Sequence, residues 1–169
     1  INVAVDNGVN FFDTADTYGL GQSEKTLAKG LGAKRKDVII ESKFGVRFGG
    51  GKSTYDNSPA YIRVALENTL QRLDTDYVDI YTIHYRDNTP IEDVVDTLVK
   101  LREEGKVRYF GLSNIHEDGL QELLPYKGLF VNCQDEYSLA CRKFESDLNK
   151  IADLLQLNPL TWGSLGQGI

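Results

Sequence analysis

The chain has 169 residues, a formal net charge of −6 at pH 7, a pI of about 4.9 and 41% hydrophobic residues. These values predict a single domain over residues 1–169 that can bury one sizeable core. The acidic balance argues against a general nucleic-acid-binding protein, which would carry a basic face. No run of about 18 apolar residues is present, so no transmembrane helix is expected.

The N-terminal segment is not typical of a signal peptide, because Asp6, Asn7 and Asn10 interrupt any apolar stretch. The sequence contains no methionine and ends just after a glycine-rich segment, so we expect it to be part of a longer protein. Cys133 and Cys141 form no C-x-x-C motif, which favours reduced thiols in a cytoplasmic protein.

Short apolar runs alternate with helical patterns along the whole chain. Ser58 followed by Pro59 predicts the start of a helix. The basic residues 34–36 are interpreted as a solvated loop, and the glycine-rich segment 44–57 as a long loop. The predicted strands cover residues 9–13, 38–43, 78–83, 109–112, 130–134 and 159–162. The predicted helices lie within residues 1–8, 23–32, 58–73, 89–105, 118–124 and 148–155.

This alternation is the signature of an α/β fold with a parallel sheet. Nearly every predicted strand ends in polar or aromatic residues: Asp13, Lys43, His84, Ser113 with Asn114, Gln134 and Trp162. In a barrel all strand ends converge on one mouth, whereas an open sheet draws mainly on the strands at its switch point. The pattern therefore favours a barrel. No G-x-G-x-x-G motif follows the first strand, as a Rossmann fold would require.

Six segments give the chain a specific resemblance to the aldo-keto reductase superfamily, whose order and spacing they follow. They are FDTADTYG at 12–19, ESKFG at 41–45, DIYTIH at 79–84, GLSN at 111–114, QDEYS at 134–138 and WGSLG at 162–166. The resemblance implies a (β/α)₈ TIM barrel, of which this sequence would hold strands two to seven and lack the first and the eighth. It also implies that NADPH, or NADH, binds without a Rossmann motif.

The resemblance assigns roles to individual residues as well. The catalytic tetrad would be Asp13, Tyr18, Lys43 and His84. The nicotinamide carboxamide would be held by Ser113, Asn114 and Gln134. Trp162 would stack on the nicotinamide ring, and the loop with Gly163 and Leu165 would lie along the pyrophosphate.

These residue types suit the reduction of an aldehyde or ketone, which needs a hydride at carbon and a proton at oxygen. The cofactor supplies the hydride. A free tyrosine is a poor acid at neutral pH, but a nearby ammonium favours the phenolate. Lys43 could play this part for Tyr18, with Asp13 holding the lysine in place. His84 could donate to the substrate oxygen.

Each residue also has a simpler reading. Tyr18 could be a surface aromatic residue, and His84 a satisfied core histidine. Ser113 and Asn114 could cap the following helix. We read His116 as a surface residue and Asp16 as a loop residue. The two histidines share no metal-ligand spacing with each other or with the cysteines, so no metal site is expected.

Other positions belong to the strands. Cys133 is interpreted as core packing, because it precedes Gln134 and faces the other side of the strand. Asp135 stands where relatives often carry an apolar residue.

The alternative function is a cofactor-binding regulatory subunit resembling potassium-channel β subunits. As an enzyme, the protein would act on a small carbonyl substrate and bind neither nucleic acid nor membrane.

Overall fold

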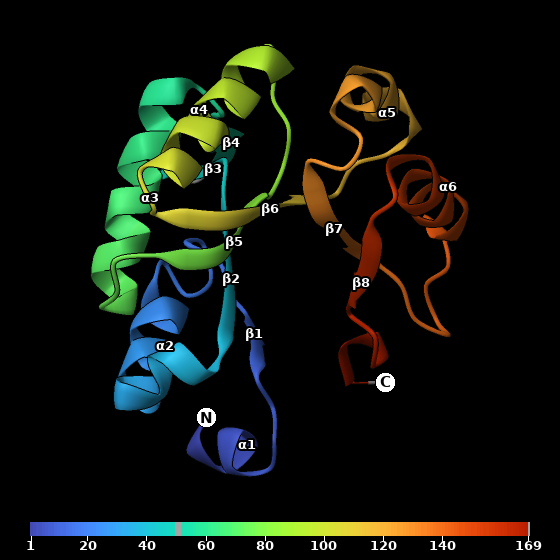
Figure 1. The fold of residues 1–169 in the computed structure, drawn as a ribbon. Helices are drawn as coiled ribbons and strands as arrows, with labels where there is room; N and C mark the ends of the chain where they lie inside the picture. The colour runs from blue at the N-terminus through green and yellow to red at the C-terminus, as the bar shows by residue number, and fades with distance from the viewer. Residues whose placement is uncertain (50–51, 169) are drawn as a thin grey trace.

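The computed structural model describes residues 1–49 and 52–168 and contains a curled parallel sheet. Its six strands follow the order β1-β2-β5-β6-β7-β8, and every neighbouring pair is parallel. Their bounds are β1 Phe11–Asp13, β2 Ile39–Phe44, β5 Val78–Ile83, β6 Val107–Ser113, β7 Phe130–Glu136 and β8 Asn158–Trp162. Figure 1 shows these strands as an arc, as expected for part of a barrel wall.

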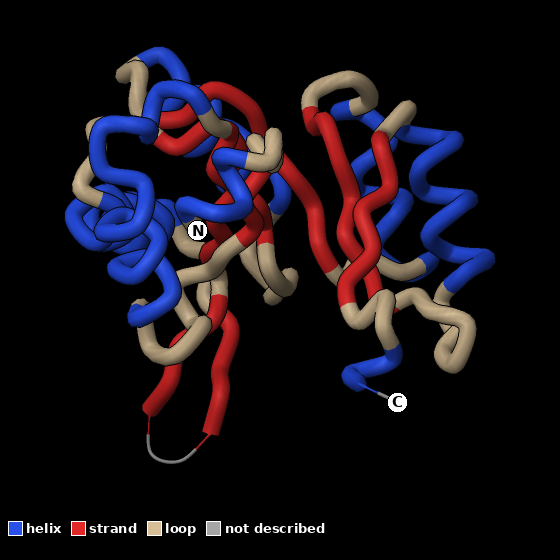
Figure 2. Tube along the Cα trace, turned by 90° about the horizontal axis from the view of Figure 1, so that it is seen from below, coloured by secondary structure: helices blue, strands red, loops and turns tan. Residues whose placement is uncertain are grey.

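The helices cover the outer side of this arc (Figures 1 and 2). Helices α2, α3 and α4 lie along one half of the sheet, and α5 and α6 lie along the other. The α-helices are α1 Asn2–Asp6, α2 Gln22–Leu31, α3 Pro59–Leu73, α4 Ile91–Glu103, α5 Glu117–Leu123 and α6 Glu145–Leu155. Short 3₁₀ helices occupy η1 Gly32–Asp37, η2 Leu124–Tyr126 and η3 Gly166–Gly168. The predicted α/β alternation is confirmed.

The hydrophobic core lies between the helices and the outer face of the sheet. Successive side chains of a strand point to opposite faces, so one set meets the helices and the other lines the inside of the arc. Ile40 and Phe44 of β2 are fully buried in the core, and Phe44 packs on Tyr81 of β5 with ring centroids 4.6 Å apart. Cys133 belongs to the same core, as predicted, and burial raises the pKa of its thiol to about 12.

The start of α3 follows the prediction. Ser58 is the N-cap, and its hydroxyl accepts a hydrogen bond of 3.4 Å from the backbone N–H of Tyr61. Pro59 occupies the first turn, where its missing N–H would have no partner in any case.

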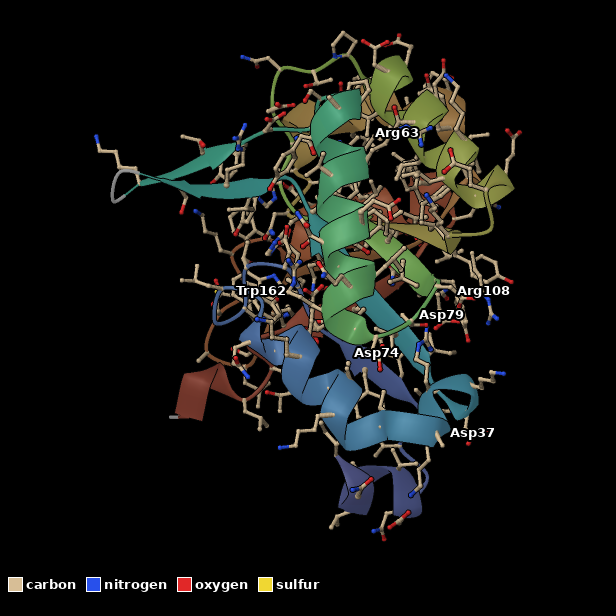
Figure 3. All side chains as sticks on the ribbon, turned by 90° about the vertical axis from the view of Figure 1, so that its left-hand side faces the viewer. Asp37, Arg63, Asp74, Asp79, Arg108 and Trp162 are labelled. Carbon is tan, nitrogen blue, oxygen red and sulfur yellow. The ribbon has the colours of Figure 1, made fainter. Side chains whose placement is uncertain are left out.

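The prediction of a long loop over residues 44–57 was wrong. Strands β3 Val46–Gly49 and β4 Lys52–Tyr55 form an antiparallel hairpin in which Val46 pairs with Tyr55. Residues 50 and 51 lie outside the described part of the chain. The glycines dominate this segment's composition and conceal two short strands. The hairpin projects away from the body of the molecule (Figures 2 and 3).

The basic run was also misread at its centre. The Arg35 guanidinium is largely buried and donates to Asp79 at 2.9 Å and to the Tyr77 carbonyl at 3.0 Å. Arg108 donates to the other oxygen of Asp79, also at 2.9 Å. Figure 3 shows Asp79 beside Arg108, far from Trp162. This charged cluster therefore lies at the opposite end of the sheet from the strand ends that carry the predicted site.

No helix in the described part of the chain is long and apolar enough to cross a membrane.

Candidate active site

The carboxyl ends of the strands meet around one cavity of about 240 Å³. Its walls contain most of the predicted site residues together with one that was not predicted, Tyr85. They are Tyr18, Lys43, His84, Tyr85, Ser113, Asn114, Gln134 and Trp162. The parallel register places these side chains at the same edge of the sheet, as expected for strands of a barrel.

Lys43 is the centre of the polar contacts. Its side chain is 1% exposed, and its Nζ donates to Asp13 Oδ1 at 2.6 Å, to the Thr14 carbonyl at 2.9 Å and to the Tyr18 hydroxyl at 3.3 Å. An ammonium out of water is tolerated only where such partners replace its hydration. Asp13 compensates the charge, and the third contact turns the remaining N–H toward Tyr18.

Asp13 also connects the two sides of the arc. Its Oδ1 accepts a second hydrogen bond, of 2.8 Å, from Nε2 of Gln134. Asp13 ends β1 and Gln134 lies in β7, so this contact crosses the inside of the curled sheet. The prediction treated the two residues as separate in role, whereas the structure joins them directly.

His84 follows β5 and continues its pairing through a hydrogen bond of 2.9 Å from its N–H to the Phe44 carbonyl. Its ring meets Tyr18 edge-on with centroids 6.0 Å apart and stacks on Tyr85 at 5.0 Å. Burial, followed by the nearby Lys43 ammonium, lowers the pKa of His84 to about 4, while Asp13 opposes the shift. His84 is therefore neutral at pH 7 and can offer one N–H donor to a ligand.

Ser113 and Asn114 hold each other and their neighbours. The Asn114 amide donates to the His84 carbonyl and to the Ser113 hydroxyl, both at 3.0 Å. Its backbone N–H donates to the Gln134 carbonyl at 2.9 Å. Asn114 has φ 53°, in the left-handed region that asparagine tolerates better than most residues. The simpler reading as helix caps is wrong, because His116 occupies the N-cap position of α5.

Trp162 ends β8 and forms a flat wall of the cavity, with 36% of its surface exposed. Its carbonyl accepts a hydrogen bond of 3.2 Å from the N–H of Tyr137. In Figure 3 it lies among the loops at the far end of the sheet from Asp79.

The sequence model of the Aldo/keto reductase family matches residues 1–169. The chain belongs to this family. The aldo-keto reductase resemblance is therefore confirmed. The predicted barrel fold is confirmed as well, because the solved structures that share the curled sheet are aldo-keto reductases.

Individual relatives agree with this placement. A probable aldo-keto reductase of Glycine max is 36% identical over 99% of this chain and 49% of its own length. The glycerol dehydrogenase AKR11B4 of Gluconobacter oxydans superposes with a TM-score of 0.89 at 31% identity, over 99% of this chain and 53% of its own. An aldo-keto reductase of Klebsiella pneumoniae in complex with NADPH gives 0.85 at 29% identity, over 98% and 56%. The chain thus spans about half the length of the curated relatives it matches.

Three predicted residues of the aldo-keto reductase site do not line the central cavity. Asp13 borders a neighbouring hollow of about 470 Å³. Gly163, at φ 67°, turns the chain after β8, and Leu165 is 84% exposed. Leu165 borders a separate open hollow of about 600 Å³ together with residues 138–140. The contact of Gly163 and Leu165 with a cofactor stays a prediction.

Glu41 is a buried acid that was not predicted from the sequence to lie inside the arc of strands. It is fully buried inside the arc, and its carboxylate accepts hydrogen bonds from Thr82 at 2.5 Å and Asn132 at 2.8 Å. Burial is the main cause that raises the pKa of Glu41. Gly111 leaves the room for this cluster, because a Cβ there would lie 2.2 Å from the Thr82 hydroxyl. An acid directly after the apolar run 38–40, inside a predicted strand, was the signal available in the sequence.

A buried side chain that was not predicted from the sequence fixes the loop after His84. Asn57 is fully buried, and its amide donates to the Tyr85 carbonyl at 3.0 Å. Gly45, at φ 105°, passes so close that a Cβ there would lie 2.8 Å from the Asn57 side-chain oxygen. The base of the hairpin is therefore fastened to the loop after β5.

Proposed function

We propose that the protein is an NAD(P)H-dependent oxidoreductase that reduces the carbonyl of an aldehyde or ketone to an alcohol. The observation that carries this proposal is the contact of Lys43 Nζ with both Asp13 and the Tyr18 hydroxyl, at the wall of a cavity that His84 shares. A tyrosine beside a buried ammonium that has its own counter-charge suits proton transfer to a developing alkoxide.

The chemistry of the cavity fits a nicotinamide ring. Trp162 offers a flat aromatic surface, while Ser113, Asn114 and Gln134 bring hydroxyl and amide groups to the same walls. A carboxamide needs such donors and acceptors when it leaves water. The NADPH complex of the Klebsiella pneumoniae relative supports this choice of cofactor, and NADH is a second option. When bound, the cofactor supplies the hydride that reaches the carbonyl carbon.

Tyr18 is the proposed proton donor. Its hydroxyl transfers a proton to the substrate oxygen as the carbon–oxygen double bond becomes single. The phenolate left behind faces the Lys43 ammonium, which is 3.3 Å away in the resting site. Asp13 keeps Lys43 oriented and charged through the 2.6 Å contact. General acid catalysis of this kind contributes about 10²–10⁴-fold to a rate.

His84 is proposed to orient the substrate. Because burial keeps the pKa of His84 near 4, its imidazole is neutral at pH 7. It therefore does not compete with Tyr18 as the proton donor. Its buried Nδ1 has no hydrogen-bond partner among the described residues. A substrate oxygen that accepts from His84 and Tyr18 together would be polarised before the hydride arrives.

The test uses the full-length protein. NADPH oxidation is measured with a panel of aldehydes and ketones, first for the wild type and then for Tyr18→Phe. We expect activity to fall at least about 10²-fold while NADPH still binds, because the ring remains and only the hydroxyl is lost. Equal activity of the two proteins would contradict the role of Tyr18. Tight NADPH binding without turnover of any carbonyl would favour the regulatory-subunit alternative.

A further inference from the structure

His116 and Asp135 lie close together next to the proposed cofactor residues, and the His116 side chain keeps 32% of its surface exposed. His116 is the N-cap residue of α5, and Asp135 lies in β7 with its side chain 3% exposed. The His116 Nδ1 lies 3.3 Å from the Asp135 Oδ2. A carboxylate this deeply buried requires a partner.

Each of the two side chains makes a further contact that fixes its position. The His116 ring stacks on Phe144, with centroids 4.0 Å apart and an interplanar angle of 19°. The other oxygen of Asp135 accepts a hydrogen bond of 2.7 Å from the backbone N–H of Glu136. Neither the His116 Nδ1 nor the Asp135 Oδ2 makes a hydrogen bond with any described residue, so the 3.3 Å contact between them is an electrostatic one.

Each residue of the pair follows a proposed cofactor-binding residue closely in the sequence. Asn114 lies two residues before His116, and Gln134 lies one residue before Asp135. These inner residues are already joined by the 2.9 Å bond from the Asn114 N–H to the Gln134 carbonyl. A left-handed backbone such as that of Asn114 persists only where the surroundings hold it. The His116–Asp135 contact ties the same loop to the same strand from its outer face.

We propose that His116 and Asp135 are positioning residues that hold Asn114 and Gln134 in the arrangement that receives the nicotinamide carboxamide. The proposal rests on the proposed function, because it takes the central cavity as the nicotinamide site. Its consequence is a cofactor affinity that depends on the charge of His116.

Acidic groups dominate the surroundings of His116. Asp135 faces it from β7, and Asp147 of α6 has an oxygen 3.9 Å from its Nδ1. Lys143, just before α6, is the opposing cation and lies 4.5 Å from the centre of the Phe144 ring. Burial is the largest cause that raises the pKa of Asp135, and the charge of His116 opposes that shift.

The pair is strongest where the imidazole is protonated and Asp135 is ionised. The two side chains attract each other less as the pH rises, because a higher pH removes protons from imidazoles. Cofactor binding should therefore gain more from the pair at about pH 6 than at about pH 8.

The experiment measures the NADPH dissociation constant of the full-length protein by calorimetry at both pH values. The variants are His116→Gln, Asp135→Asn and the double variant, with Asp153→Asn on α6 as a matched control. We expect each single variant to bind about fivefold more weakly than the wild type at pH 6 and within about twofold at pH 8. The double variant should be no weaker than the weaker single variant, because both changes remove one interaction.

Equal losses at both pH values, or losses that add in the double variant, would overturn the proposal in favour of a merely structural role. If His116→Gln does not fold, Asp135→Asn alone decides through the same comparison of pH values, since its shape is unchanged. Wild-type protein that does not bind NADPH would overturn the proposed function and this inference together. Wild-type binding with unchanged affinity in the variants would overturn this inference alone.

Discussion

Gln134 donates a hydrogen bond of 2.8 Å from its side-chain amide to Asp13, which also accepts from Lys43 at 2.6 Å. One carboxylate oxygen thus joins a residue proposed to bind cofactor to the residues proposed to move a proton. The groups proposed for cofactor binding and for proton transfer are therefore in direct contact, and a change at Gln134 should affect both proposed activities.

Gln134→Met keeps the length of the side chain and removes its polar groups. We expect the affinity for NADPH to fall about tenfold, because a buried hydrogen-bonding partner is lost. The turnover rate should fall less, since Asp13 keeps its contact with Lys43. Steady-state kinetics at saturating and limiting NADPH separate the two effects. Gln71→Met, on exposed α3 surface, is the control and should leave both unchanged.

Lys43→Met removes the buried charge while keeping the volume. We expect the turnover rate to fall about 10²–10⁴-fold, because no ammonium would stabilise the phenolate of Tyr18. The free energy of unfolding should change by less than about 1 kcal/mol, since Asp13 is 37% exposed and water can solvate its charge. Kinetics and urea denaturation measure these quantities. Lys34→Met, which breaks an exposed ion pair with Asp6, should change neither. A loss of stability matching the loss of activity would contradict the assignment.

Asp16→Asn should stabilise the protein at pH 8 and not at pH 4. Burial, followed by the charge of Glu24, raises the pKa of Asp16 from 3.8 to about 7, and its Oδ1 has no hydrogen-bond partner among the described residues. The folded state therefore holds the proton more tightly than the unfolded state, and stability falls as the pH rises from about 4 through 7. We expect a gain of about 2 kcal/mol at pH 8, since an amide keeps part of the burial cost.

Thermal or urea unfolding at the two pH values measures the effect of Asp16→Asn. The exposed Asp96→Asn on α4 should shift the unfolding free energy by less than about 0.5 kcal/mol at either pH. An equal gain at pH 4 and pH 8 would mean that the charge of Asp16 is not its cause.

Asp79→Asn should destabilise the fold by about 3 kcal/mol. Asp79 is 4% exposed and accepts from Arg35, Arg108 and the N–H of Ile40, so its loss leaves the largely buried Arg35 guanidinium without a counter-charge. Denaturant titration is the measurement. The turnover rate per folded molecule should stay the same, because the cluster lies at the far end of the sheet from the cavity. Asp37→Asn, which is exposed near the same end (Figure 3), is the control.

The sequence was sufficient for the six strands of the parallel sheet, the α-helices and the convergence of Asp13, Tyr18, Lys43 and His84. Period-3.6 and period-2 patterns reflect burial, which local sequence records well. Placing polar residues at strand ends then follows from the parallel topology. The single-domain reading and the assigned roles of the site residues stay predictions.

The error at Arg35 has a different physical cause. Arg35 was interpreted from its neighbours in sequence, but its environment is set by Asp79, which lies 44 positions away. Burial of a charge depends on such distant partners, and no local pattern encodes them. The hairpin was missed because its two strands are only four residues long and lie in a segment with several glycines.

The hairpin β3–β4 meets the rest of the molecule through its base. The Asp56 N–H donates to the Gly45 carbonyl at 3.0 Å, and the Tyr55 ring stacks on Tyr85, 5.0 Å away, which in turn stacks on His84. Beyond this base the hairpin extends into solvent (Figure 2). A change in the length or sequence of the hairpin beyond its base should therefore leave the proposed proton-transfer residues in place. Selectivity for new compounds is open to change through Tyr55, which is half exposed and reaches the reacting groups only through a chain of rings.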